Sequence, residues 1–209
     1  MSVGASVRRM FGRHERLISD LYRGLFMSLE DYGAMIGKWA AKPRRILEVG
    51  CGEGAVTEIL AATFPDAQVL AIDITPRTGR MYQGRIDGVE FRQATVQAIA
   101  AEQPGAFDLI VLSDVIHHIP AELRAGVLDA IGQALAPGGR FVLKDWSSSA
   151  TPIHWLCHGG DRWLTGARVA HLSPAEAKSL VTRHVPKLQP VGEERIRPWR
   201  NNYAILFSC

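Results

Sequence analysis

The residues most able to do chemistry form a short glycine-rich segment directly after an apolar run. Residues 46–49 (ILEV) are followed by residues 50–54 (GCGEG), and a helical pattern begins immediately afterwards. Glycines at alternate positions let the backbone approach a ligand and adopt dihedral angles that a β-carbon forbids. The free N–H groups of the following helix point into the same space. Because Glu48 adds a carboxylate at the end of the strand, this segment predicts a cradle for a nucleotide-like ligand that carries a positive charge.

A second polar side chain follows the next predicted strand. Asp73 ends the apolar run 68–72, and its carboxylate could accept hydrogen bonds from both hydroxyls of a ribose. The glycine turn also fits the looser dinucleotide pattern, because Gly50 and Gly52 are followed by Ala55. These residues alone therefore leave a nicotinamide-dependent dehydrogenase open, and Asp73 could instead cap the following helix.

Strands and helices alternate from Arg45 onward, and this alternation is what must position the polar residues. The run 109–112 is uninterrupted and apolar, as in a central strand that helices cover on both faces. The pattern predicts a three-layer, doubly wound, Rossmann-like α/β sheet, mostly parallel with an antiparallel C-terminal strand, whose ligand lies beyond the carboxyl ends of the strands. The predicted strands are residues 45–49, 68–72, 89–93, 107–112, 139–145, 189–196 and 202–208.

Three helices have clear start or stop signals. Ser28 with Asp31 and Ser173 with Glu176 resemble capping boxes, and they predict helices that begin after each serine. A third helix should begin at Pro120 and end before the Pro-Gly-Gly turn at 137–139. Its predicted inner face consists of Leu123, Val127, Ile131 and Leu135.

Composition bounds the class of protein. The chain has 209 residues, 47% hydrophobic and 22% charged, which suits one soluble domain without a membrane-spanning run. The arginine-rich N-terminus lacks the apolar core and cleavage site of a secretory signal. The three scattered cysteines, Cys51, Cys157 and Cys209, indicate reduced thiols and a cytoplasmic protein. A net charge of +3 without a basic stripe argues against nucleic-acid binding.

Taken with Glu48, the Pro-Gly-Gly turn and the closing strand pair, the chain resembles the class I S-adenosylmethionine-dependent methyltransferases. Residues 48–54 match the first motif of that family and residues 71–73 the second, while residues 107–112 and 135–139 match its fourth strand and the approach to its fifth. The resemblance covers roughly residues 45–145 and the tail, and it implies four parts within one domain. These are an N-terminal helical lid (1–41), a cofactor-binding core (42–145), a substrate-lid insertion (146–172) and the completion of the core (173–209).

The resemblance implies S-adenosylmethionine as cofactor and S-adenosylhomocysteine as product. Glu48 and the backbone of the glycine turn would hold the methionine end, and Asp73 would bind the ribose. Ile74 and Val96 would sandwich the adenine, while Thr95 stands where many members carry an acid that accepts from the adenine amino group. The predicted cofactor-binding residues are Glu48, Gly50, Cys51, Gly52, Asp73, Ile74, Thr95, Val96 and Ser113.

The methyl acceptor is expected to be a small molecule. Family members that methylate nucleic-acid bases carry an Asn/Asp-Pro-Pro-aromatic motif after the fourth strand, where this chain reads SDVIHH at 113–118. By resemblance, the first histidine faces the pocket, so His117 is the candidate general base or acceptor-orienting group and His118 a structural residue. The aromatic residues of the insertion could form flat walls for a planar substrate. The predicted substrate-binding residues are His117, Trp146, His154, His158 and Trp163.

Two spacings could gather metal ligands. Asp114, His117 and His118 lie at positions i, i+3 and i+4, and His154, Cys157 and His158 have a similar helical spacing. Neither set has the additional carboxylates or the fourth ligand that a dedicated site would need, so no metal is predicted.

These observations predict methyl transfer from S-adenosylmethionine to an oxygen or activated carbon of a hydroxylated aromatic, quinone-like or polyketide-derived acceptor. Two alternatives remain at this point, a NAD-dependent oxidoreductase and a catalytically silent, cofactor-binding scaffold subunit. The oligomeric state is left open, with a homodimer as one option.

Overall fold

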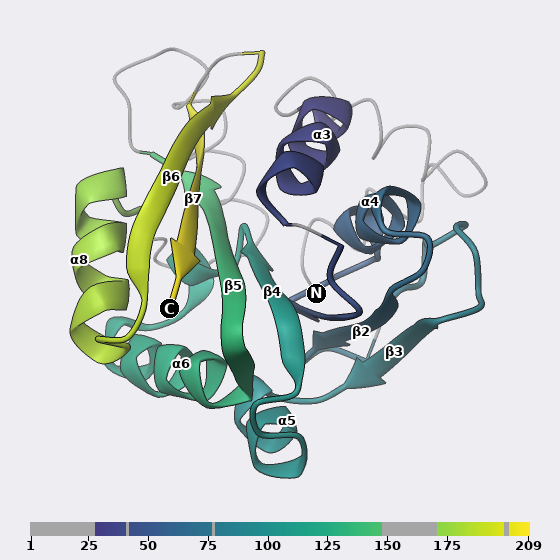
Figure 1. Ribbon diagram of the computed structural model, residues 1–209, viewed down its shortest axis with the longest axis horizontal. Coiled ribbons are helices and arrows are strands. Elements are labelled where there is room, and N and C mark those ends of the chain that lie inside the picture. Colours follow the sequence, from purple (N-terminus) through teal and green to yellow (C-terminus); the bar gives the residue numbers. More distant parts are fainter. Residues whose placement is uncertain (1–27, 41, 77, 148–170, 199–200) are drawn as a thin grey trace, which may run out of the picture.

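The computed structural model describes residues 28–40, 42–76, 78–147, 171–198 and 201–209. Within this part of the chain, seven strands form a single sheet in the order β3-β2-β1-β4-β5-β7-β6 (Figure 1). Strands β1 to β5 are parallel, and β7 pairs antiparallel with both β5 and β6. The predicted fold class is therefore confirmed. The strands are Arg45–Val49 (β1), Gln68–Asp73 (β2), Val89–Gln93 (β3), Phe107–Ser113 (β4), Leu135–Trp146 (β5), Gln189–Ile196 (β6) and Asn202–Ser208 (β7).

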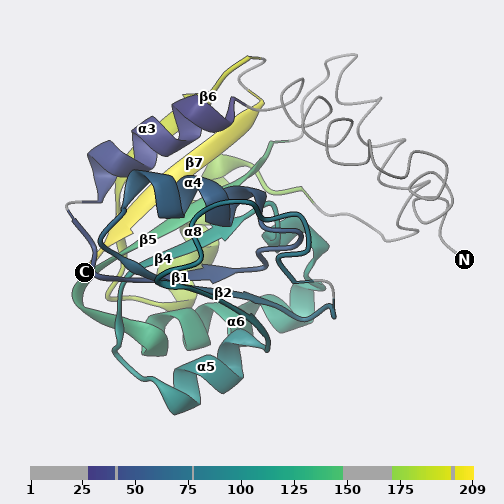
Figure 2. The same cartoon turned by 90° about the vertical axis from the view of Figure 1, so that its right-hand side faces the viewer.

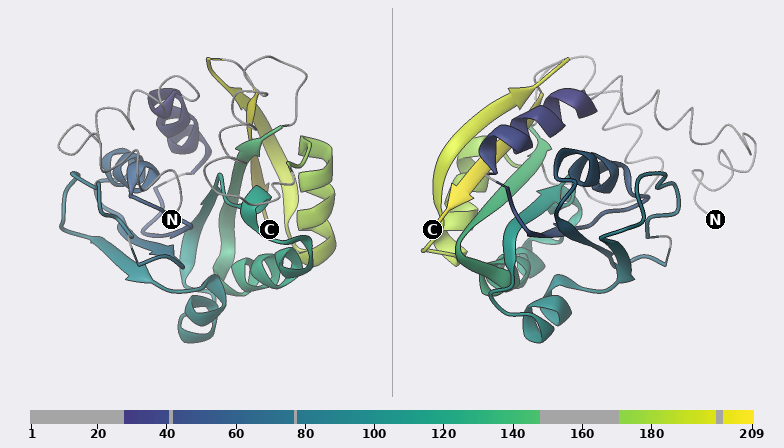
Figure 3. Two further views of the ribbon diagram at one scale, coloured as in Figure 1. Left: turned by 180° about the vertical axis from the view of Figure 1, so that it is seen from behind. Right: turned by 45° about the vertical axis from the view of Figure 1, so that its right-hand side comes forward.

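Helices cover both faces of the sheet, because alternate residues of its central strands are apolar on each side. Helices α3 (Leu29–Trp39) and α4 (Ala55–Thr63) pack on one face with Ile46, Leu109 and Val111. Helices α5 (Val96–Glu102), α6 (Ala121–Ala134) and α8 (Pro174–His184) pack on the other. Figure 2 shows α3 and α4 opposite α5 and α6, and Figure 3 shows α8 beside β6 and β7.

The predicted helix starts at Ser28 and Ser173 are confirmed. The Ser28 hydroxyl oxygen accepts the Asp31 N–H at 3.2 Å, and α3 begins at the next residue. Ser173 and Glu176 form a reciprocal capping box at the start of α8, with Pro174 in the first turn. Each cap satisfies N–H groups that the first helical turn cannot pair internally. The N-terminal helix expected before Ser28 lies outside the described residues.

Two sequence predictions were wrong in detail. Strand β5 begins at Leu135, not at residue 139, because the Pro-Gly-Gly turn stays within the strand and shifts its register against β4. Leu123 does not face the core, since the residue is 57% exposed. The buried stripe of α6 runs instead through Arg124, Leu128 and Ile131.

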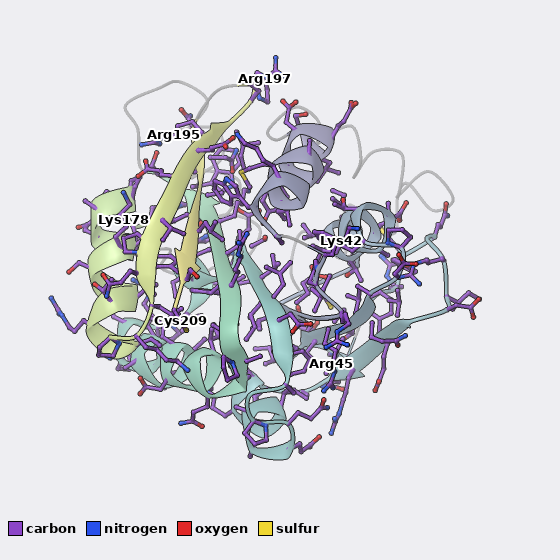
Figure 4. The ribbon with its side chains drawn as sticks, viewed as in Figure 1. Lys42, Arg45, Lys178, Arg195, Arg197 and Cys209 are labelled. Carbon is purple, nitrogen blue, oxygen red and sulfur yellow. The ribbon has the colours of Figure 1, made fainter. Side chains whose placement is uncertain are left out.

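The parallel strands place all their carboxyl ends on one edge of the sheet, where the polar residues of the candidate site gather. Figure 4 labels residues near the amino and the carboxyl edge of the sheet. Arg45 and Cys209 lie at the amino edge of β1 to β5, and Arg195 and Arg197 lie toward the carboxyl edge. None of the helices in the described ranges is both long enough and apolar enough to cross a membrane.

The corrected orientation of α6 predicts different costs for two leucines on the same helix. Leu128→Ala should lower the free energy of unfolding by about 2–5 kcal/mol, because Leu128 is fully buried and the substitution leaves a cavity. Leu123→Ala, the matched control, should change it by less than about 0.5 kcal/mol. Urea denaturation measures both, and equal losses would contradict the assigned face.

Candidate active site

The glycine turn after β1 has the backbone geometry of a ligand cradle. Gly50, Gly52 and Gly54 all have positive φ, at 77°, 51° and 99°. The N–H groups of Gly50 and Cys51 both donate to the Ile72 carbonyl, at 2.8 and 3.0 Å. A β-carbon on Gly50 would lie 2.3 Å from Val115 Cγ2, whereas one on Gly52 would meet nothing within 4 Å. Gly50 therefore allows a close packing contact, and Gly52 borders open space.

Asp73 holds this turn in place from the end of β2. Its Oδ2 accepts the Gly52 N–H at 2.9 Å, and its Oδ1 accepts the Thr75 N–H at 2.8 Å. A carboxylate has about four lone-pair sites, so each oxygen retains capacity for a further donor such as a ribose hydroxyl. Ile74, the next residue, is 73% exposed, which offers an apolar surface directly beside this carboxylate.

Glu48 lies beneath the turn, and 2% of it is exposed. Its Oε2 accepts the Thr57 hydroxyl at 2.6 Å, from the first turns of α4. Burial raises the pKa of this carboxyl to about 7, the Thr57 hydrogen bond opposes the rise, and the charge of Asp73 adds to it. No lysine, arginine or histidine of the described residues forms an ion pair with Glu48. That the ammonium of a ligand supplies the missing cation stays a prediction.

Cys51 and the predicted adenine-contacting residues, Thr95 and Val96, differ in exposure. Cys51 is buried, and burial raises the pKa of its thiol, with the charges of Glu48 and Asp73 adding to the rise. Thr95 caps α5, and its hydroxyl oxygen accepts the Ala98 N–H at 3.2 Å. That hydroxyl can still donate to a ligand, but Val96 is only 3% exposed. The adenine contacts of Thr95 and Val96 stay predictions.

Ser113 and Tyr32 connect the end of β4 to α3. The two hydroxyls are 2.5 Å apart and both residues are buried, so the contact fixes α3 against the carboxyl edge. Burial raises the pKa of the Tyr32 phenol, which keeps this hydroxyl neutral. Ser113 thus reaches the carboxyl edge from the same face as Glu48, because Tyr32 and Thr57 belong to the two helices that cover that face.

Asp114 does not join the histidines, contrary to the metal-ligand spacing in the sequence. It has a positive φ of 57°, and both of its carboxylate oxygens accept from Lys144 Nζ, at 2.7 and 2.6 Å. Lys144 is 1% exposed and also lies 5.7 Å from the centre of the Trp146 ring. The ion pair satisfies a buried ammonium and holds the start of the loop after β4.

His117 is fixed on both sides of its ring. Its Nδ1 hydrogen-bonds with Asp145 Oδ1, and its Nε2 lies 3.0 Å from His118 Nε2. The exposures run opposite to the sequence expectation, because His117 is 4% exposed whereas His118 is an exposed residue. His117 is therefore buried together with its partner Asp145, which is fully buried.

His171 completes a cluster that the sequence analysis missed. Its ring centre lies 5.2 Å from that of His117, and one ligand atom each from His117, Asp145 and His171 lies within 4.8 Å of the others. These three residues could hold a metal ion. The pattern has no local spacing, because Asp145 is the next-to-last residue of β5 and His171 precedes α8. Of the other predicted substrate residues, Trp146 is half-buried at the end of β5, whereas His154, His158 and Trp163 lie outside the described residues, as does Cys157.

Comparison with known proteins identifies the class of this protein. A protein-family model described as a methyltransferase domain matches residues 47–141. The chain is 30% identical to a ubiquinone biosynthesis O-methyltransferase of Xanthomonas campestris over 75% of this chain and 68% of that protein. It is 34% identical to trans-aconitate 2-methyltransferase of Methylobacterium nodulans over 56% of this chain, and spans 43% of that relative's length.

The fold agrees with these relatives. The 1,6-didemethyltoxoflavin-N1-methyltransferase of Burkholderia thailandensis, solved with S-adenosylhomocysteine, superposes with a TM-score of 0.69 and 18% identity. The superposition covers 98% of this chain and 88% of that chain. The chain belongs to the class I S-adenosylmethionine-dependent methyltransferases, as the resemblance predicted. Its methyl donor is S-adenosylmethionine, which excludes the alternative of a NAD-dependent oxidoreductase.

The raised pKa of Glu48 predicts a specific dependence of stability on pH. The folded protein keeps the Glu48 proton up to about pH 7, whereas the unfolded chain loses it near the ordinary value of 4.5. This group therefore stabilises the fold below about pH 4.5, and that contribution of about 3 kcal/mol is lost as the pH rises through 7. Glu48→Gln keeps an acceptor for Thr57 without a titrating proton.

The ligand-free Glu48→Gln variant should match the parent protein at about pH 4.5 and be more stable by up to about 3 kcal/mol at pH 8. Urea denaturation across this range measures the difference. Glu122→Gln, which neutralises an exposed carboxylate on α6, controls for the change in net charge. A constant difference between parent and Glu48→Gln at every pH would contradict the assignment.

Proposed function

We propose that this enzyme transfers the methyl group of S-adenosylmethionine to an oxygen of a small hydroxylated aromatic or quinone-like acceptor. The observation that carries the proposal is the buried His117–Asp145 pair, which lies at the carboxyl ends of β4 and β5 beside the glycine cradle. The similarity to a ubiquinone biosynthesis O-methyltransferase supports the same chemistry. An activated carbon of a polyketide-derived acceptor is the second candidate, because both atoms react as nucleophiles that must first lose a proton.

The residues of the cradle fit the methyl donor. The buried Glu48 lacks a basic partner within the described chain and suits the ammonium of the amino-acid portion. Asp73 retains acceptor capacity for the ribose hydroxyls, and the exposed Ile74 offers an apolar face to the adenine. Gly52 borders open space where a side chain would stand in the way. Ser113 is proposed to contact the same ligand from the end of β4.

For the proposed reaction the protein needs mainly to align the acceptor oxygen with the methyl group and to remove the hydroxyl proton. The cofactor supplies a methyl group on a sulfonium, from which the acceptor oxygen displaces a neutral thioether. A carbon–oxygen bond forms, the carbon–sulfur bond breaks with its electron pair on sulfur, and the hydroxyl proton must leave. His117 would orient that hydroxyl or take its proton at Nε2, in place of the contact with His118, and Asp145 would stabilise the imidazolium that results.

The walls of the acceptor site are proposed from the residues around the carboxyl edge. Trp146 lies at the end of β5, half-buried, and Lys144 packs over its ring. His154, His158 and Trp163 are proposed to add further flat surfaces against a planar acceptor. The scattered thiols, including the buried Cys51, favour a reducing compartment, so we place the enzyme in the cytoplasm.

Binding of S-adenosylhomocysteine tests the role of Glu48 directly. The ammonium should pair only with ionised Glu48, so affinity should rise with pH up to about 7, by at most about tenfold per unit, and then level off. Glu48→Gln should bind about 10–100-fold more weakly at pH 8 and lose this dependence. Isothermal titration calorimetry measures both, with NAD as a negative control, and an unchanged affinity in Glu48→Gln would refute the contact.

Turnover tests the role of His117. A screen of phenolic, catecholic and quinol acceptors with isotopically labelled methyl donor should reveal methylated products. His117→Gln should then lower kcat by about 10²–10⁴-fold while affinity for S-adenosylhomocysteine stays the same. His184→Gln, on α8, is the matched control and should retain full turnover. Full activity in a folded His117→Gln variant would leave His117 a structural residue, and absence of any turnover with bound cofactor would favour the scaffold alternative.

A further inference from the structure

Three potential ligands meet at the carboxyl edge from three separate segments of the chain. His117 belongs to the short 3-10 helix η2 (Ile116–His118), Asp145 to the end of β5, and His171 to the segment just before α8. One ligand atom from each lies within 4.8 Å of the other two. We propose that this cluster binds one divalent transition-metal ion of the zinc type, with the three side chains as its protein ligands.

The donor set matches that class of ion. Two imidazoles and one carboxylate are typical ligands of zinc and of neighbouring first-row metals, and they are poorly suited to magnesium or calcium, which take oxygen ligands. Three protein ligands leave a coordination position for water or a substrate oxygen, as in catalytic zinc sites. The cluster therefore has the composition of a metal site that keeps one coordination position open for an exogenous ligand.

Asp145 supplies the second, independent observation. It is fully buried, and its Oδ1 contacts His117 and accepts the Trp146 N–H at 2.7 Å. Its Oδ2 is buried with no hydrogen-bond donor, and no lysine or arginine of the described residues forms an ion pair with the carboxylate. A buried carboxylate oxygen without a donor costs free energy, and a cation would remove that cost. The neighbouring strand does not relieve it, because the Tyr203 hydroxyl, in register on β7, is itself buried and makes no hydrogen bond.

A proton is the competitor of the metal at this position. In the structure His117 Nδ1 bonds directly with Asp145 Oδ1, which requires one hydrogen between them. A metal ion would replace that hydrogen and bring His171 into the same coordination sphere. Because His117 Nε2 lies 3.0 Å from His118 Nε2, His118 would serve as an outer partner that orients the ligating ring.

The position of the cluster connects it to methyl transfer. Val115, two residues before His117, packs against the Cα of Gly50 in the donor cradle. A metal with an open position here could hold the acceptor hydroxyl and lower its pKa, and it would then replace His117 as the group that assists loss of the proton. This role rests on the proposed function, whereas metal binding itself does not depend on it.

Metal titration of the full chain tests the proposal without an acceptor. Protein treated with a chelator should take up one Zn²⁺ per chain by calorimetry, and Co²⁺ should give the visible absorption of a low-coordinate nitrogen and oxygen site. Exposed Cys209 is replaced in all samples by Cys209→Ser, so that its thiol does not contribute. His171→Gln and Asp145→Asn should each weaken the binding by at least about tenfold, and His184→Gln should leave it unchanged.

Two outcomes would overturn the proposal. One is the absence of saturable Zn²⁺ binding by the parent protein, which would leave a proton between His117 and Asp145. The other is equal affinity in the parent and in His171→Gln, above all if Cys157→Ser abolishes binding, which would move the site to the His154, Cys157 and His158 spacing. His171→Gln keeps the Asp145–His117 contact, so its folding is less at risk than that of Asp145→Asn. Titrating the same samples with S-adenosylhomocysteine reports on the donor site separately, which distinguishes failure of the metal site from failure of the proposed function.

Discussion

The geometry of the candidate site depends on the carboxylate of Asp73, which bonds the Gly52 N–H and the Thr75 N–H at the ends of two neighbouring strands. A turn in which successive glycines have positive φ loses much conformational freedom on folding, and this carboxylate provides fixed partners that hold it. The fixed turn also sets the position of Val115, because the Val115 side chain fits only where Gly50 has no β-carbon. Through Val115 the donor cradle positions η2, and with it the buried His117.

Most of the fold could be predicted from the sequence because its central strands are long apolar runs separated by strong turn and cap signals. The bounds of β1, β3, β6 and β7 agree with those predicted. The errors arose where the type of a residue does not match its place in the structure. Arg124 is buried on the inner face of α6, where its Nε donates to the Ile119 carbonyl. Because the prediction counted only apolar residues, it placed the inner face of this helix one position too early. The Pro-Gly-Gly segment reads as a turn, but pairing with β4 keeps it in the strand.

The elements of the proposed donor side could be predicted from the sequence, whereas the neighbours of His117 could not, for a physical reason. A glycine turn, its preceding acid and the acid of the next strand are local motifs, since one strand-turn-helix unit and its neighbour build the cradle. Asp145 and His171 come from segments distant from His117 in the sequence, and only the sheet order brings Asp145 next to the loop after β4. The spacing of Asp114 with the two histidines was misleading because Lys144, adjacent to Ser113 in the β4–β5 register, takes the Asp114 carboxylate.

The distribution of buried charge argues that this edge is built for ligands. Glu48 is buried on the face covered by α3 and α4, and Asp145 on the face covered by α6 and α8, and neither pairs with a lysine or arginine of the described residues. The buried Lys144 at the same edge pairs instead with Asp114, which is partly exposed. Solvating an ion pair in this way lowers its cost, whereas a buried carboxylate without a lysine or arginine partner is costly. The arrangement is understandable if each buried carboxylate has a cation to meet, the ammonium of the methyl donor at Glu48 and a proton or metal ion at Asp145.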